Sequence, residues 1–156
     1  MKVRELTRDD NLDVVLALCR GFFAEYERHH REFFDTDDLT DDHIAGRFRQ
    51  SLEDDDSATI VATVDSAIVG YASAVVREQP PFYRIKRIGA ISTLMVAPEY
   101  RRRGVGTALL DGARSFFKRR GVKYYTFYTA AGNEAAIRLY EKLGFEPLHR
   151  SFLGEV

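Results

Sequence analysis

The sequence has little of several residues on which small secreted or membrane proteins depend. Its 156 residues include one cysteine, no tryptophan, two methionines and four prolines. A single cysteine excludes an internal disulfide, and no apolar run approaches the roughly 20 residues of a membrane-spanning helix. The stretch MKVRELTRDD also lacks the apolar core of a signal peptide. We therefore expect a cytoplasmic protein without a membrane partner.

A strong excess of charge of either sign is also missing. The 23 Lys and Arg against 24 Asp and Glu give a net charge of −1, whereas nucleic-acid-binding domains are usually clearly basic. A binder of RNA or DNA that uses RRRG and the tyrosines of KYYTFY has this balance against it, and we expect no nucleic-acid partner. The length and the 45% of hydrophobic residues fit one globular domain over residues 1–156.

The spacing of apolar residues alternates between strand-like and helical periods along the chain. The predicted strands cover residues 2–6, 58–65, 67–78, 87–97, 122–129 and 145–153, the last as a strand or hairpin. The predicted helices run from the TRDD turn to about residue 29, and over residues 40–53, 104–120 and 133–144. Thr7 with Asp10 predicts a capping box for the first helix. The order βααβββαβαβ predicts an α/β domain with a mixed sheet.

Three arginines directly precede GVG within STLMVAPEYRRRGVGTALLDGARSFFKRRG, residues 92–121. The start of a helix carries partial positive charge, so cations there are unfavourable unless an anion binds. Unpaired amides and glycines at such a start make an anion site. Neither a Walker loop nor a dinucleotide fingerprint fits, because Gly-Lys-Ser/Thr is absent and Leu109 stands where a third glycine is required. A solvated basic turn is the simpler alternative.

The segment LMVAPEYRRRGVGTALL resembles the coenzyme A signature of the GNAT superfamily of N-acetyltransferases, in which an apolar strand and a proline precede Arg/Gln-x-x-Gly-x-Gly/Ala. Arg101, Gly104 and Gly106 fill the defining positions. NEAAIRLYEKLGF is similar to the second acetyl-CoA motif of that family, and TRDD to the usual start of its first helix. The resemblance implies a single-domain GNAT-like fold with a mixed, mostly antiparallel central sheet flanked by helices. It also implies acetyl-CoA as co-substrate, with no metal.

The resemblance assigns coenzyme binding to two neighbouring segments. Backbone groups of a strand should pair with the pantetheine arm, and amides of the following turn should hold the pyrophosphate. The strand residues are Leu94, Met95 and Val96. The turn residues are Arg101, Arg102, Arg103, Gly104, Val105, Gly106 and Thr107, of which Arg101 is expected to shape the loop. Asn133 is expected to touch the coenzyme as well as to cap its helix, although capping alone would explain it.

The implied reaction is direct attack of an amine on the thioester in a ternary complex. Tyr140 is the candidate acid for the departing thiolate, and packing against the sheet is its simpler role. A strand amide at Met95 or Val96 is the candidate oxyanion donor. The strand AISTLMV has no carboxylate where some family members carry a Glu, so the general base stays unassigned. The alternatives on the first helix are Glu25, Glu27, His29 and His30.

A covalent mechanism through the single cysteine is a further alternative. Cys19 lies in the apolar stripe of the first predicted helix. A free cysteine in such a stripe commonly packs as a small hydrophobe. We therefore expect Cys19 to be structural.

The acceptor is expected between the first two helices and the later strands. There Tyr26, Phe33 and Phe34 are candidates for an apolar wall, while the nearby aspartates either attract a cation or belong to a solvated loop. A polyamine, an amino sugar or a protein N-terminus would fit, so we expect a small amine or a protein amino group as acceptor. A non-catalytic acetyl-CoA-binding sensor or partner module is the alternative function. A homodimer is left open, because it could bury edge strands and exposed aromatics.

Overall fold

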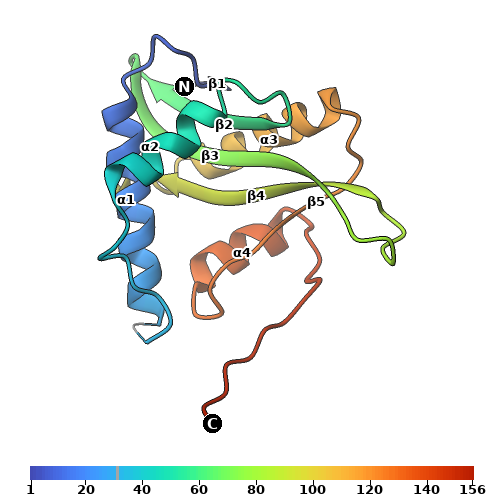
Figure 1. Cartoon of the computed structure of the whole chain (residues 1–156). Helices are drawn as coiled ribbons and strands as arrows, with labels where there is room; N and C mark the ends of the chain where they lie inside the picture. The colour runs from blue at the N-terminus through green and yellow to red at the C-terminus, as the bar shows by residue number, and fades with distance from the viewer. Residues whose placement is uncertain (31) are drawn as a thin grey trace.

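The structure is a computed structural model that describes residues 1–30 and 32–156 (Figure 1). Its elements follow in the order β1 (Lys2–Glu5), α1 (Leu12–His29), α2 (Asp41–Gln50), β2 (Ser57–Val64), β3 (Ala67–Glu78), β4 (Arg87–Val96), the 3-10 turn η1 (Pro98–Tyr100), α3 (Val105–Arg119), β5 (Tyr125–Phe127) and α4 (Glu134–Lys142). This is the predicted order except for the last strand.

The five strands form one mixed sheet in sequence order, β1-β2-β3-β4-β5. β1 through β4 pair antiparallel, and β5 joins β4 in parallel. Asp65 and Ser66 link β2 to β3 with positive φ angles of 47° and 68°. Two such residues are the signature of a type I′ hairpin turn, whose twist matches that of the strands. The predicted mixed, mostly antiparallel sheet is therefore confirmed.

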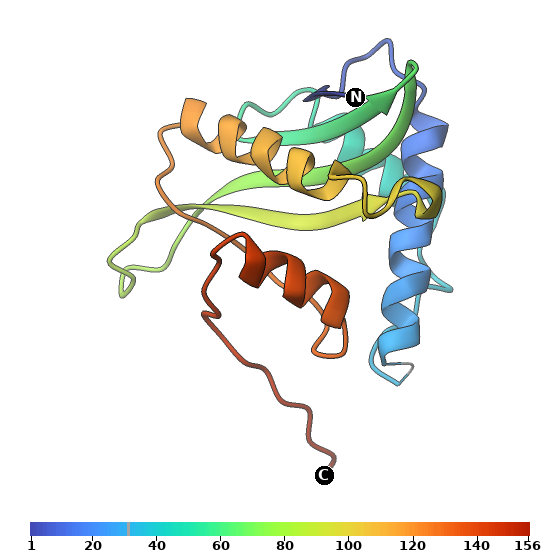
Figure 2. The same ribbon diagram turned by 180° about the vertical axis from the view of Figure 1, so that it is seen from behind.

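Helices cover both faces of the sheet (Figure 2). On one face, α3 buries Leu109, Ala113 and Phe116 against the strands. On the other, α1 and α2 bury Val15 and Phe48 together with side chains of β2 and β3. The site described below lies where these two layers approach the end of β4.

The first helix begins later than predicted. Asn11 is its N-cap and accepts the amide of Asp13 at 3.0 Å, so the helix starts at Leu12 rather than within the TRDD turn. The carboxylate of Asp10 instead accepts the amide of Thr7 at 2.8 Å and forms two 2.6 Å hydrogen bonds with Arg4. Asp10 therefore fastens the turn to β1 and does not complete a capping box.

The last predicted strand is absent, and the one before it is short. β5 has three residues where eight were expected, and residues 145–153 form no strand. Residues 146–156 are all exposed, and in Figure 1 this tail leaves the body of the molecule. Pro147 cannot donate a ladder hydrogen bond, and three-residue β5 offers a single chain little to pair with.

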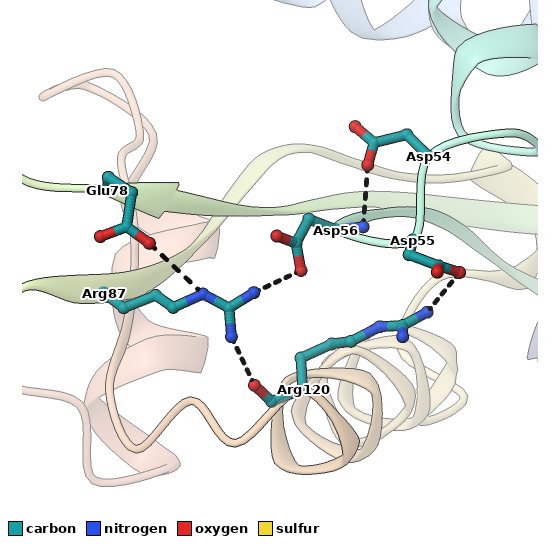
Figure 3. A network of polar contacts seen from close by, with 6 residues as sticks. All are labelled: Asp54, Asp55, Asp56, Glu78, Arg87 and Arg120. Carbon is teal, nitrogen blue, oxygen red and sulfur yellow. Dashed lines mark hydrogen bonds and ion pairs between the residues drawn. The ribbon is translucent and has the colours of Figure 1, made fainter.

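A network of charged side chains joins the ends of four elements, β2, β3, β4 and α3 (Figure 3). Arg87 at the start of β4 contacts Asp56 before β2 at 2.5 Å and donates to the carbonyl of Arg120, after α3, at 2.7 Å. Glu78 at the end of β3 lies 3.5 Å from the Arg87 guanidinium, and Asp55 lies 3.3 Å from that of Arg120. Exposed pairs stabilise weakly one by one, but this set fixes the C-terminal end of α3 over the sheet. The N-terminal end of α3 lies at the opposite end of β4, where that strand ends.

Candidate functional site

A β-bulge in β4 opens one edge of that strand. Ser73 pairs with Thr93 and Ala74 with Ile91, which leaves Ser92 as an extra residue. β5 pairs with β4 only as far as Ile91. A bulge bends its strand and increases its twist, so β4 diverges from β5 at this residue. From Ser92 onward, no strand among residues 1–30 and 32–156 pairs with β4 on its β5 side.

The alternation of the ladder decides which backbone groups face this open edge. Ala97 donates its amide to Val69 at 2.9 Å, so its polar groups point toward β3. In an antiparallel ladder the next residues alternate, which turns the amides and carbonyls of Val96 and Leu94 away from β3. Arg101 does donate to the carbonyl of Val96 at 3.0 Å on that side. The groups of Met95, in contrast, belong to the ladder with β3.

The turn between η1 and α3 presents a run of unpaired backbone amides. Arg102 and Gly104 have positive φ angles of 62° and 82°, which curl the chain into an anion-binding concavity. Within residues 1–30 and 32–156, none of the six amides from Arg102 through Thr107 donates to another protein group. α3 also begins without a side-chain cap, whereas Asn11, Thr40 and Asn133 cap the other three α-helices. The start of α3 is therefore open to an anion.

The three arginines of this turn have different surroundings. Arg101 forms a 2.5 Å ion pair with Glu25 of α1. Together with its bond to the Val96 carbonyl, this pair holds α1, β4 and the turn in place. Arg102 and Arg103 are exposed and form no ion pair in the described part of the chain, although Arg103 lies over the ring of Tyr100. Their charges remain available to a ligand.

Helix α4 brings Tyr140 to the same region. Asn133 caps this helix by accepting the amide of Ala136 at 3.2 Å, as predicted. The Tyr140 ring packs on Phe127 of β5 at a centroid distance of 4.2 Å. Burial raises the pKa of the Tyr140 phenol to about 12, with a smaller contribution from Tyr26. The phenol is therefore protonated at neutral pH and can donate a hydrogen bond.

The three aromatic residues predicted for the acceptor lie together at the end of α1. The ring centroid of Phe34 lies 5.0 Å from that of Tyr26 and 4.9 Å from that of Phe33. Tyr26 is buried, whereas Phe33 is 61% exposed. Tyr26 therefore belongs to the packed end of this cluster and Phe33 to its surface.

The candidates for a general base are mostly engaged elsewhere. Glu25 is paired with Arg101, and Glu27 accepts the amide of Thr36 at 2.7 Å. His29 and His30 are exposed at the end of α1. Burial raises the pKa of the Cys19 thiol, which keeps it protonated and supports its expected structural role.

Sequence reasoning missed a second group of polar residues, Arg47, Ser73 and Thr93, which line a small cavity beside β4. One signal could have found Arg47. It stands three residues after Ile44 on α2, and residues three apart share a helix face. Arg47 itself is exposed, so the signal is a charged residue at the border of the buried stripe of Ile44 and Phe48.

Within the described part of the chain, no cluster of three or more His, Cys, Asp or Glu residues could hold a metal ion. None of its helices is both long and apolar enough to cross a membrane.

A family model described as the acetyltransferase (GNAT) family matches residues 20–145. An uncharacterized N-acetyltransferase of Bacillus subtilis, YhfO, is 31% identical over 148 residues, which cover 94% of this chain and 90% of the relative. An N-alpha-acetyltransferase of Sulfurisphaera tokodaii is 32% identical over a stretch that covers 64% of this chain and 62% of the relative. An uncharacterized N-acetyltransferase of Methanocaldococcus jannaschii is 26% identical over 92% of this chain. The matched stretch spans only 60% of that relative's length. The chain spans 41% of the mycothiol acetyltransferase of Propionibacterium freudenreichii, at 28% identity over 88% of its own length.

Solved structures share the whole fold. A tetramutant of the BH1408 protein of Bacillus halodurans matches with a TM-score of 0.87 and 21% identity over 100% of both chains. The aminoglycoside N-acetyltransferase AAC(6')-Iy in complex with CoA matches with a TM-score of 0.80 and 18% identity, over 99% of this chain and 93% of its own. At these identities the likeness establishes the fold alone.

Proposed function

Because the chain belongs to the GNAT family of acetyltransferases, we propose that it moves the acetyl group of acetyl-CoA to an amine by direct attack in a ternary complex. The observation that carries this proposal is the run of six unpaired amides from Arg102 through Thr107, beside the open edge of β4. We propose further that residues 1–156 act as a single N-acetyltransferase domain.

Coenzyme binding would use both features of the site. The amides of the turn and the partial positive charge of the α3 start would hold the pyrophosphate, with Arg102 and Arg103 adding charge. The open-edge groups of Leu94 and Val96 would pair with the amides of the pantetheine arm, as in the addition of a strand to a sheet. Arg101 would act indirectly, because its guanidinium already serves Glu25 and the Val96 carbonyl.

Acetyl transfer needs a donor for the oxyanion and a proton for the departing sulfur. We propose the amide of Val96 as the oxyanion donor, since it faces the open edge whereas that of Met95 faces β3. Tyr140 would donate its phenolic hydrogen toward the sulfur. With the phenol at a pKa of about 12 and a thiol near 8.5, complete transfer would cost about 5 kcal/mol. This difference in pKa favours a hydrogen bond from the phenol to the sulfur. The proton would be fully transferred only as the carbon–sulfur bond of the thioester breaks.

The acceptor is proposed to be a small amine or a protein amino group. This class fits the N-acetyltransferase names of several relatives. The cluster of Tyr26, Phe33 and Phe34 would provide an apolar wall near Tyr140, since Tyr26 lies close enough to contribute to the raised pKa of Tyr140. No side chain is assigned as general base.

The decisive experiment is calorimetric titration of the protein with acetyl-CoA, with desulfo-coenzyme A and ADP as further ligands. We expect micromolar binding of the two coenzymes, and weaker binding of ADP because it lacks the pantetheine arm. Gly106→Asp should abolish this binding without unfolding the protein, since its carboxylate would occupy the anion site. Gly106→Ala is the matched control, because a Cβ there would lie 3.6 Å from Leu139, an ordinary contact.

Two results would contradict the proposal in different ways. Unchanged acetyl-CoA affinity in Gly106→Asp would show that the turn is not the phosphate site. Tight binding of acetyl-CoA without thiol release across a panel of amines would refute transfer and favour the sensor or partner module.

A further inference from the structure

A cavity of about 30 Å³ lies between α1, α2 and the face of the sheet formed by β3 and β4. Arg47 of α2, Ser73 of β3 and Thr93 of β4 provide its polar lining, and Cys19 and Phe23 of α1 close another side. This volume holds about two water molecules. A volume of this size suits a small group such as a carboxylate.

Two buried hydroxyls, one lining this cavity and one on the neighbouring strand β3, form no hydrogen bond within the described part of the chain. Thr93 is 8% exposed, and its hydroxyl is fully buried without a hydrogen bond. The hydroxyl of the fully buried Tyr71 is likewise unpaired. Within residues 1–30 and 32–156, no carboxylate forms an ion pair with Arg47. Unpaired buried hydroxyls are costly, so these groups indicate a polar ligand.

The charge of Arg47 reaches the interior of this region. Burial raises the pKa of both Cys19 and Tyr71, and the nearby guanidinium of Arg47 opposes that shift in each. A guanidinium also presents its donors in a planar fork that matches a carboxylate. The cavity is therefore bordered by one cation, Arg47, and by the hydroxyls of Ser73 and Thr93.

The cavity also lies next to the proposed reaction centre. Thr93 follows the bulge residue Ser92 and precedes Leu94, whose backbone groups face the open edge of β4. A ligand anchored at Thr93 would therefore place its other end beside the strand segment proposed to hold the thioester.

We propose that Arg47, Ser73 and Thr93 bind the carboxylate of the acceptor, and that the acceptor is a small molecule with both an amine and a carboxylate. This inference rests on the proposed function and names its substrate class. The cation of Arg47 repels an ammonium group, so it attracts the acid end of such a molecule and turns the amine away toward β4. Arg47 is thus a specificity-determining residue for the acceptor.

The test compares amines in pairs that differ only by a carboxylate: serine with ethanolamine, lysine with cadaverine, and phenylalanine with phenethylamine. Thiol release gives kcat/KM for each member with the wild-type protein, Arg47→Ala, Arg47→Lys and Arg49→Ala. Arg49 is the matched control, because it lies on the same helix and does not line the cavity. We expect a preference of about tenfold for the carboxylated members, from charge-assisted hydrogen bonds of the carboxylate with the exposed Arg47 guanidinium and the buried Thr93 hydroxyl.

Arg47→Ala should reduce this preference to near unity, Arg47→Lys should restore part of it, and Arg49→Ala should retain it. A wild-type preference for the decarboxylated amines would overturn the inference. An unchanged preference in Arg47→Ala would also overturn it, because Arg47 would then be an ordinary surface cation.

A binding measurement keeps the inference testable without turnover. Calorimetric titration of each amine into the protein saturated with desulfo-coenzyme A compares its affinity for the wild-type protein and for Arg47→Ala. Carboxylated amines should bind the wild-type protein more tightly than their decarboxylated partners, and Arg47→Ala should remove this difference. Equal affinities for both members of a pair would refute the carboxylate site even where acetyl-CoA binds, whereas loss of acetyl-CoA binding refutes the proposed function.

Discussion

At the scale of the residue, Tyr140 illustrates how surroundings change the chemistry of a familiar side chain. It lies among Phe127, Phe145 and Tyr26, and the apolar contacts raise its pKa by disfavouring the phenolate. A phenol in this environment stays a hydrogen-bond donor at every pH at which the protein would be assayed. Its role is therefore separable from that of a base, which must lose its proton.

We expect Tyr140→Phe to lower kcat by about 100-fold, the low end of what a positioned acid contributes. Affinity for acetyl-CoA should be unchanged, because the ring and its packing remain. Tyr124→Phe, at a 47% exposed tyrosine, is the control. Because the pKa of Tyr140 is about 12, this group should cause no alkaline loss of kcat below about pH 10. Full turnover in Tyr140→Phe would exclude it from the mechanism.

The arginines of the RRR run show where sequence reasoning about the site stops. Its motif and spacing predicted an anion site, which stays a prediction at a turn whose amides are unpaired. The motif could not predict that Arg101 is paired with Glu25, because the two residues are far apart in sequence. Nor could it predict Arg47 as a cavity residue, since the cavity also needs Thr93 from a strand shifted by a bulge.

At the scale of the element, the turn between β1 and α1 depends on one carboxylate. Asp10 is bound by Arg4 and by the amide and hydroxyl of Thr7, and these contacts hold its pKa well below its usual value. A lowered pKa in the folded state means that the stabilisation is complete above the unfolded pKa, near 4. It is lost as the pH falls below that value and the carboxylate takes up a proton.

Asp10→Asn should therefore lower the free energy of unfolding by about 1–2 kcal/mol at neutral pH, allowing for the partly exposed partner Arg4. The difference from wild type should shrink as the pH is lowered from about 5 toward 2, measured by urea unfolding at each pH. Asp9→Asn is the control, since Asp9 forms no ion pair in the described part of the chain. A constant difference across this pH range would show that the ion pair is not the cause.

Two helical glycines should respond oppositely to the same substitution. A Cβ at Gly112 of α3 would lie 2.7 Å from Ile60 and 2.8 Å from Val3, so Gly112→Ala should destabilise the fold by about 1–3 kcal/mol. A Cβ at Gly46 of α2 meets nothing within 4 Å. Gly46→Ala should therefore stabilise the fold by up to about 1 kcal/mol through helix propensity. Chemical unfolding measures both, and a neutral Gly112→Ala would contradict the close packing of α3 on β1 and β2.

The elements themselves were largely predictable, because their signals are local. Thr40 and Asn133 cap their helices as predicted, and the Asp65–Ser66 turn follows from two strand-like runs separated by a short polar link. The wrong predictions concern segments whose structure depends on contacts with residues far away in the sequence. Asp10 is drawn to Arg4 rather than to a helix start, and residues 145–153 lack a neighbouring strand to pair with.

At the scale of the whole molecule, the site results from one continuous segment held between two layers. The site is built from consecutive parts of the chain: β4 with its bulge, the arginine turn and α3. The open edge of β4 and the unpaired amides of the turn are therefore neighbours. α1 holds the turn through Glu25, and the network of Arg87 holds the other end of α3. The candidate site therefore depends on contacts at both ends of the sheet.

The C-terminal tail gives the last prediction at this scale. Residues 146–156 are all exposed, including the apolar Leu148, Phe152 and Leu153. Because a single chain buries none of them, deleting residues 148–156 should change the free energy of unfolding by less than about 0.5 kcal/mol. Urea unfolding and sedimentation at several protein concentrations would measure this. A larger loss of stability, or a smaller particle after the deletion, would show that a second copy of the chain covers the tail.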